Sequence, residues 1–403
     1  MAQQSIHDVS WWWEMRNNST ESTMLVATIF VLILAILWCK LKRSNSSNGA
    51  PSLPPGPRSC PIIGYLPFLS SELHTQLTNM AHTYGPIFRF KLGSKLHVVI
   101  NTPELAKVVV RDQDEVFSNR DQSVAGLAMT YGGQDIAMSN NNPNWRTLRK
   151  IFVHEVLSNK NLEASGSFRR DEVRKALKNI FAKTGTAIDV REIAFSTETN
   201  VLTRTIWENT LDEGVKHRNL GAELDVVASN MVRIFGRVNL SDYFPSLARF
   251  DLQGVERDMK MQRDKLDKLF TSIIEDRIES NVKRSQGEME HEGKKYFVQI
   301  LLEHRDEKDD TSLSMTQMKA LLLDVMIAGT ETTATTVEWA MTSLPLAEKM
   351  LMLILASLLH SFDWSLPKGE EHDLTEVFGL SLKKRKPLIA IPIQRLYDVS
   401  LYM

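Results

Sequence analysis

The sequence lacks most features that identify disulfide-rich, metal-binding or nucleic-acid-binding proteins. It has two cysteines, Cys39 and Cys60, among 403 residues, which excludes a disulfide framework and a cysteine-rich metal site. Its 48 basic and 49 acidic residues nearly balance, so no overall charge attracts nucleic acid. It contains no internal repeat. The length allows one large domain or two ordinary ones.

The one long apolar run, Met24–Cys39, is predicted to be a membrane anchor. Thr28 is its only polar residue, and a basic cluster at 40–43 follows it. A helix of this length spans about 24 Å, slightly less than a hydrocarbon core of about 30 Å, and snorkelling lysines can close the gap. A cleaved signal peptide is the alternative, but only Arg16 precedes the run as a fixed positive charge and no small-residue cleavage site follows.

The basic cluster also predicts orientation, because positive residues flank the cytosolic end of a span. Residues 1–23 would be a lumenal tail, 24–39 a transmembrane anchor and 40–57 a basic and proline-rich hinge. The hinge ends in Pro-Pro-Gly-Pro at 54–57, which favours a stiff, extended backbone.

Apolar periodicity predicts a mainly α-helical fold with a small β part. Alternating residues around Gly93–Lys95 predict a β-hairpin over 88–100, and Pro103 occupies the favoured first position of a helix to Arg111. Strand-like alternation returns at 380–396. Further helices are predicted near 144–158, 165–182, 191–210, 219–236, 251–282 and 294–305, with charged exposed loops at 283–294 and 304–312.

The most unusual stretch is a predicted 29-residue helix, Met315–Ser343, about 43 Å long. Ser314 and Gln317 are spaced for a capping box at its start, and Pro345 ends it. Residues 321–327 are almost all apolar, so the helix is expected to run through a core. Its centre contains a glycine, a carboxylate and five threonines, a combination that indicates a functional site.

Four residues at this centre are candidate site residues. The small side chains of Ala328 and Gly329 leave a groove in which a flat ligand could approach the backbone. Thr332 can bond to the carbonyl one turn earlier and widen the helix locally, and Glu331 could supply or relay protons. The alternative is a close helix–helix crossing that uses small residues, with Glu331 exposed.

Trp145 and Arg149 form a second candidate site. They lie one turn apart on one face of a predicted helix. An indole N–H beside a guanidinium makes a good clamp for a carboxylate, which arginine can bind bidentately. The alternative is an ordinary amphipathic helix with the tryptophan packed inward and the arginine solvated.

Three motifs in this order resemble those of one protein family. They are the Pro-Pro-Gly-Pro hinge after an anchor, Trp145-x-x-x-Arg149, and Ala-Gly-Thr-Glu-Thr-Thr at 328–333. Residues 24–396 resemble the cytochrome P-450 superfamily of haem-thiolate monooxygenases, especially plant microsomal enzymes that hydroxylate terpenoids and phenolics. The resemblance implies the cytochrome P-450 fold and a single-pass protein of the endoplasmic reticulum membrane with its globular part in the cytosol.

The resemblance also implies roles for the candidate residues. Trp145 and Arg149 would hold a haem propionate, with Ala328 and Gly329 against the haem. Thr332 would hydrogen-bond iron-bound dioxygen and Glu331 would help to deliver protons. Residues near 121–139 would line the pocket for a small lipophilic substrate. The electrons would come from NADPH through NADPH-cytochrome P-450 reductase, and one oxygen atom would be inserted into the substrate.

Two motifs that the family requires are missing. The family's iron ligand is a cysteine in a Phe-x-x-Gly-x-Arg-x-Cys-x-Gly loop, whose thiolate favours O–O cleavage, but no cysteine follows Cys60. No arginine has a glutamate three residues before it, so the family's Glu-x-x-Arg pair is absent too. We therefore assign no metal ligand, because nothing positions His360 or another side chain as a substitute.

The two losses share one apparent seam, at Ser343/Leu344. The residues from 344 resemble the helix that follows the ligand loop in relatives, so roughly a hundred residues are missing. The expected domains are then 58–343, the N-terminal part of the catalytic domain, and 344–403, a remnant with a helix and a β-hairpin. We expect a kinked rod or an antiparallel helix pair at the seam, exposed apolar helix faces and low stability.

Three hypotheses for function follow. The chain is by descent a haem-dependent monooxygenase, inactive because its thiolate ligand is missing. Alternatively, it is a non-enzymatic, membrane-anchored helical protein that binds hydrophobic ligands or the reductase. A soluble helical binding protein with a cleaved signal is the third.

Overall fold

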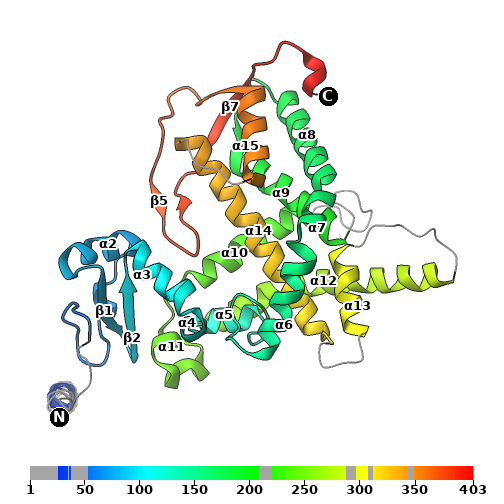
Figure 1. Ribbon diagram of the computed structural model, residues 1–403. Coiled ribbons are helices and arrows are strands. Elements are labelled where there is room, and N and C mark those ends of the chain that lie inside the picture. The colour runs from blue at the N-terminus through cyan, green and yellow to red at the C-terminus, as the bar shows by residue number, and fades with distance from the viewer. Residues whose placement is uncertain are drawn as a thin grey trace, which may run out of the picture. The chain divides into compact units, whose positions relative to one another are not determined.

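Figure 1 shows the computed structural model of the chain. It forms two compact units, Met1–Lys107 and Val108–Met403, and each is considered by itself. The residues that the structure describes are 26–34, 36–37, 53–207, 220–286, 296–306, 312–343 and 349–402.

The predicted anchor is described only in part. Residues 26–34, 36 and 37 are helical, and large apolar side chains such as Val26, Phe30 and Val31 are exposed there. No helix within the described residues combines the length and hydropathy needed to cross a membrane. The tail at 1–23, the ends of the predicted anchor and most of the hinge lie outside the described residues.

Unit 1 is built around a β-hairpin. Strands β1 (Ile87–Leu92) and β2 (Lys95–Ile100) are antiparallel, with Leu92 opposite Lys95. Gly93 turns the chain between them in the left-handed region, with φ 53°. Helices α2 (Leu73–Tyr84) and α3 (Pro103–Lys107) flank the hairpin in the chain. The predicted hairpin is confirmed, and the predicted helix begins at Pro103.

The proline-rich segment is hydrogen-bonded to strand β1. The backbone N–H of Arg89 donates to Pro55 O at 2.8 Å, and its side-chain Nε donates to Pro54 O at 2.9 Å. A Cβ on Gly56 would lie 1.8 Å from Arg89 O, so the backbones can approach this closely only at a glycine. Residues 54–56 therefore belong structurally to unit 1.

Unit 2 is mainly helical. Its α-helices are α4 (Asp114–Phe117), α5 (Val124–Met129), α6 (Pro143–Ile151), α7 (Asn159–Ala164), α8 (Gly166–Ala182), α9 (Val190–Trp207), α10 (Leu220–Phe235), α11 (Leu240–Tyr243), α12 (Val255–Ser285), α13 (Phe297–Asp306), α14 (Met315–Ser343) and α15 (Lys349–Ser361). Shorter helical turns are η2 (Val108–Asp112), η3 (Phe152–Val156), η4 (Pro245–Phe250) and η5 (Val399–Tyr402). The predicted helices are confirmed, although α12 and α13 continue past the predicted starts of the two charged loops.

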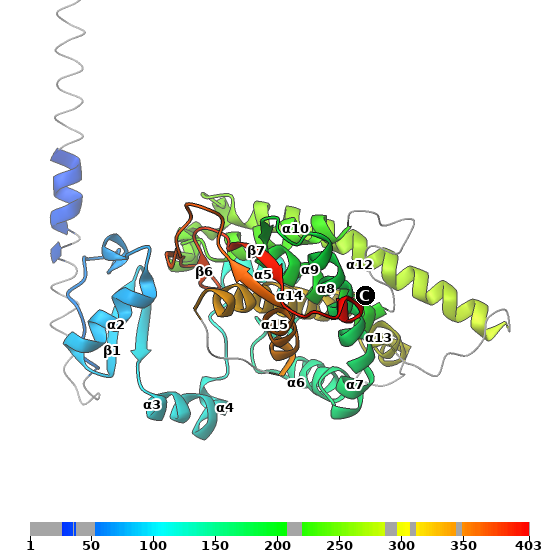
Figure 2. The ribbon, with the colours of Figure 1, turned by 90° about the horizontal axis from the view of Figure 1, so that it is seen from above.

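Helix α14 runs through the middle of unit 2. Figures 1 and 2 show it beside α9, and it also packs against α10, α12 and α15. The first half of α14 belongs to the main hydrophobic core, with Leu321 and Leu322 fully buried. Because residues 321–327 are almost all apolar, this part of the helix is stable only inside such a core.

The β part of unit 2 is small. A three-stranded antiparallel sheet has the order β3 (Ile188–Asp189), β7 (Ile389–Gln394), β4 (Phe362–Ser365), and β5 (Glu376–Val377) pairs with β6 (Lys383–Lys384).

Helix α15 leads directly into β4 and packs against α8 and α14. Its side chains Ile354, Leu355 and Leu358 are buried. For the described side chains of α15, 353–361, the expectation that helices next to the seam expose their apolar faces is therefore wrong.

Candidate functional site

Helix α14 begins and ends where the sequence predicts. The Ser314 N–H donates to Gln317 Oε1 at 2.7 Å, and the Gln317 N–H donates to Ser314 Oγ at 3.2 Å. This reciprocal pair is the predicted capping box, and it satisfies two backbone donors at the start of the helix.

The centre of α14 has one open face. Ala328, Thr332 and Thr336 are spaced four residues apart and are exposed. The Thr332 hydroxyl donates to Ala328 O at 2.6 Å, which is the predicted bond to the preceding turn, and the Thr336 hydroxyl repeats it to Thr332 O at 2.7 Å. The open face therefore presents small side chains whose hydroxyls are bonded to their own helix.

Gly329 does not lie on the open face but packs against helix α9. A Cβ built on Gly329 would lie 2.7 Å from Leu202 Cδ1 of α9. The space that the glycine leaves is thus filled by a side chain of the neighbouring helix. At this residue the geometry is that of a close helix–helix crossing.

Glu331 is buried in an ion cluster on the side of α14 away from Thr332. Its side chain is 1% exposed, and its Oε2 lies 2.5 Å from the Arg191 guanidinium of α9. Lys383 of β6 pairs with the other carboxylate oxygen. Arg191 also lies 3.7 Å from Asp225 of α10, whose pKa is raised by burial. The carboxylate of Glu331 therefore joins three elements of the fold.

Trp145 and Arg149 are held together on α6. Asn142 caps the helix by accepting the Trp145 N–H at 2.8 Å. The Arg149 guanidinium lies 5.4 Å from the centre of the Trp145 ring. The indole N–H, however, donates to the Ile136 carbonyl at 3.0 Å. A carboxylate at this clamp would meet an indole donor that is already in use.

Two acidic residues that the sequence analysis did not single out meet nearby. Asp324 of α14 accepts the Ile136 N–H at 2.8 Å, and Asp135 accepts the Met138 N–H at 2.8 Å. Burial raises the pKa of both side chains. Their signal in the sequence was an acid within the apolar stretch 321–327.

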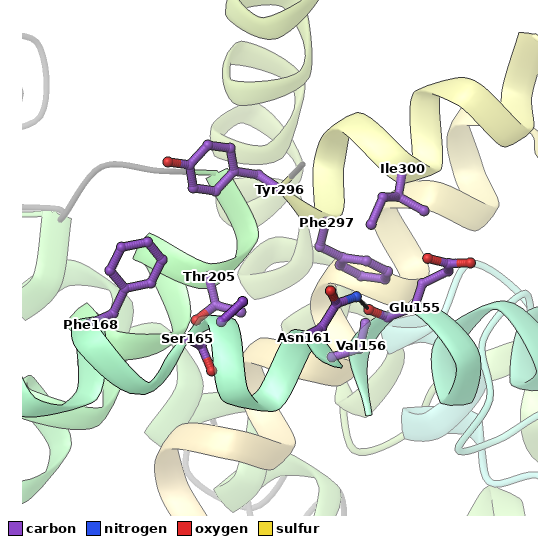
Figure 3. A pocket seen from close by; sticks show the side chains of 10 residues that line it. Glu155, Val156, Asn161, Ser165, Phe168, Thr205, Tyr296, Phe297 and Ile300 are labelled. Carbon is purple, nitrogen blue, oxygen red and sulfur yellow. Dashed lines mark hydrogen bonds between the residues drawn. The ribbon is translucent and has the colours of Figure 1, made fainter. Parts of the chain in front are cut away.

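The cavity in Figure 3 does not include any of the candidate residues. It measures about 50 Å³, far below the roughly 300–1,000 Å³ of typical ligand pockets. Its lining residues are Glu155, Val156, Asn161, Ala164, Ser165, Phe168, Thr205, Tyr296, Phe297 and Ile300.

The side chains of unit 2 do not fit a thiolate-ligated haem. Residues 108–403 contain no cysteine. Among the described residues, no three or more His, Cys, Asp and Glu side chains form a group that could hold a metal ion. A haem placed on the open face of α14 would have no thiolate in this unit.

Comparison with known proteins identifies one family. The profile of the family described as Cytochrome P450 matches residues 54–345. Flavonoid 3',5'-hydroxylase of Solanum melongena is 33% identical over 330 residues, covering 80% of this chain and 61% of the relative. 3,9-Dihydroxypterocarpan 6A-monooxygenase of Glycine max is 31% identical over 327 residues, covering 80% of this chain and 62% of the relative. The chain thus spans about three fifths of the length of these relatives.

Two further comparisons cover nearly the whole length of the protein that is compared with this chain. Cytochrome P450 76C1 of Arabidopsis thaliana is 25% identical over 509 aligned residues, covering 94% of this chain and 98% of the relative. A zebra fish cytochrome P450 structure with abiraterone superposes with a TM-score of 0.62 at 14% identity, covering 80% of this chain and all of that one, which shows a shared fold. Because the family profile matches well over half of its residues, the chain belongs to the cytochrome P450 family.

Proposed function

We propose that this chain descends from a haem-dependent monooxygenase that hydroxylated a lipophilic plant secondary metabolite with O2 and electrons from NADPH, and that the chain itself does not catalyse this reaction. One observation carries the proposal: unit 2 contains the complete α14 helix but no cysteine. Haem supplies oxygen activation in this family when a thiolate binds its iron. Without that ligand, the chain has half of a haem site.

An internal loss at Ser343/Leu344 accounts for the missing ligand. The family profile ends at residue 345, next to this seam. The alignment with the Arabidopsis relative has 509 positions, whereas the chain has 403 residues, so more than a hundred positions have no counterpart here. We therefore divide the globular part into 58–343, which retains one side of the site, and 344–403, the C-terminal remnant.

The candidate residues have separate parts in this proposal. Ala328 and Thr332 form the surface on which the cofactor of an intact relative would lie, while Glu331 stabilises the packing behind it. Trp145 and Arg149 would meet a propionate only if the indole released the Ile136 carbonyl. Gly329 contributes through its contact with α9.

The membrane assignment rests on the apolar helix of unit 1, and the partner assignment rests on membership of the cytochrome P450 family. We propose that residues 24–39 anchor the chain in the endoplasmic reticulum membrane, supported by the exposed apolar side chains of the helix at 26–34. NADPH-cytochrome P-450 reductase is the expected redox partner of an intact relative. A second candidate function is non-enzymatic binding of this reductase or of a lipophilic ligand.

The carbon monoxide difference spectrum tests the proposal. The expressed chain, reduced and exposed to carbon monoxide, is expected to lack the absorption band after which the family is named. As a control, the segment of a relative that contains the Glu-x-x-Arg pair and the ligand loop is inserted between Ser343 and Leu344, and this variant is expected to show the band. A clear band from the unmodified chain would overturn the claim of inactivity.

A further inference from the structure

We propose that Asp135 and Asp324 share one proton and form a clasp that fixes the loop 130–139 to α14, and that the clasp opens when both carboxyl groups are ionised. This acid clasp (Asp135 with Asp324) is independent of haem and of the proposed function. It assigns both residues a positioning role for the loop.

The hydrogen bonds show why a shared proton is needed. Asp324 Oδ2 accepts the Ile136 N–H, and Asp135 Oδ2 accepts the Met138 N–H, each at 2.8 Å. The Asp135 side chain is fully buried, and its Oδ1 has no donor among the described residues. Because Asp324 binds the N–H of the residue that follows Asp135, the two carboxyl groups lie close together, and a hydrogen bond between them affects the pKa of both. Because two carboxylates have only acceptors, one must carry a proton to make this bond.

The surroundings favour the protonated form. Burial is the main cause that raises the pKa of both groups, and with the charge of Asp135 nearby the pKa of Asp324 rises to about 8. The charged groups on the packed elements are engaged elsewhere. Lys319 of α14 lies 3.0 Å from Asp267 of α12, and Arg263 of α12 donates to the Ala128 carbonyl at 3.0 Å.

The loop is held at several points, and the clasp is its hydrogen-bonded link to α14. The Arg120 and Gln122 side chains donate to the Ala137 and Met138 carbonyls at 3.3 and 3.1 Å. Tyr131 donates to Asp267 at 2.8 Å, and Arg263 lies over the Tyr131 ring. Gly132 and Gly133 follow with φ of 82° and 81°, a left-handed conformation that glycine adopts without strain. Beyond them the Ile136 carbonyl accepts the Trp145 indole N–H. The acid clasp therefore connects α14 through the loop to Trp145 of α6.

The sign of the pH dependence follows from the raised pKa. The folded chain keeps a proton that the unfolded chain releases near pH 4, so the stability contributed by the pair declines as pH rises from about 4 to about 8. Above about pH 8 both groups ionise, their bond is lost and two buried like charges repel. The loop should then detach from α14 while the helices remain folded.

Hydrogen exchange on the full chain in detergent tests the clasp. The amide protection factors of Ile136 and Met138, corrected for intrinsic rates, are expected to fall at least about tenfold between about pH 6 and about pH 10, with far-UV circular dichroism unchanged. In Asp324→Asn the amide group can donate to Asp135 at any pH and still accept from Ile136, so protection should stay constant. Asp135→Asn should give the same result.

The matched control is Asp276→Asn, which changes an exposed acid of α12 and should keep the wild-type fall in protection. If the wild-type protection factors do not change with pH, the shared-proton clasp is wrong. It is equally wrong if both asparagine variants fold and show the same fall as the wild type. Neither result bears on the carbon monoxide spectrum, so the two proposals fail separately.

Discussion

Adjacent residues of α14 have different surroundings, because successive positions on an α-helix point about 100° apart. Glu331 is buried and paired with Arg191 and Lys383, whereas Thr332 is exposed and its hydroxyl donates to Ala328 of its own helix. The motif that groups them in the sequence therefore contains one side chain that stabilises the fold and one that is open to a ligand.

Replacing these two residues should separate the two roles. Glu331→Ala removes the buried carboxylate that Arg191 and Lys383 share, and we expect the free energy of unfolding to fall by about 3 kcal/mol. Thr332→Ala should change it by less than about 0.5 kcal/mol. Urea denaturation followed by circular dichroism measures both. Equal losses in the two variants would contradict this division of roles.

At the scale of elements, the close crossing of α14 and α9 depends on the glycine at position 329. Leu202 occupies the space beside Gly329, and a Cβ there would lie 2.7 Å from the leucine Cδ1. Alanine in a helix interior is favoured over glycine by about 1 kcal/mol, but overpacking a core costs about 1–3 kcal/mol. The close contact therefore outweighs the gain in helix propensity.

A double-mutant cycle tests the crossing. Gly329→Ala alone is expected to lower the free energy of unfolding by up to about 2 kcal/mol. In a Leu202→Ala background the same change should become stabilising by about 1 kcal/mol, because the clash is removed and the helix propensity remains. A coupling energy near zero, again from urea denaturation, would show that the two side chains do not interact.

At the scale of the whole molecule, the question is whether the chain stays with the membrane. The apolar side chains of the helix at 26–34 are exposed, and exposed apolar surface of this kind marks a site of contact with lipid or protein. We expect the expressed chain to remain in the microsomal pellet after alkaline carbonate extraction, and a variant lacking residues 1–39 to be released. Recovery in the supernatant of a shortened form from which residues 24–39 have been cleaved would rule out a retained anchor.

Local patterns in the sequence were sufficient where the determinants are local. The capping pair Ser314 and Gln317 and the apolar run at 321–327 predicted α14 with its observed bounds. Alternation around Gly93 predicted the hairpin over 88–100, and the structure has it over 87–100. The missing cysteine is also a property of the sequence alone. These features depend on neighbours within a few residues or on composition, so they need no knowledge of the fold.

The tertiary structure decided which way the candidate side chains face. Glu331 meets Arg191 and Lys383, Gly329 meets Leu202, and Asp324 meets the loop at 135–138, all over separations that local periodicity does not encode. The helices, the family motifs and the lack of an iron-ligating cysteine can all be read from local patterns and composition. Only the packing of distant elements decided which motif residues are open to a ligand and which are buried between helices, because burial and pairing are set by contacts far along the chain.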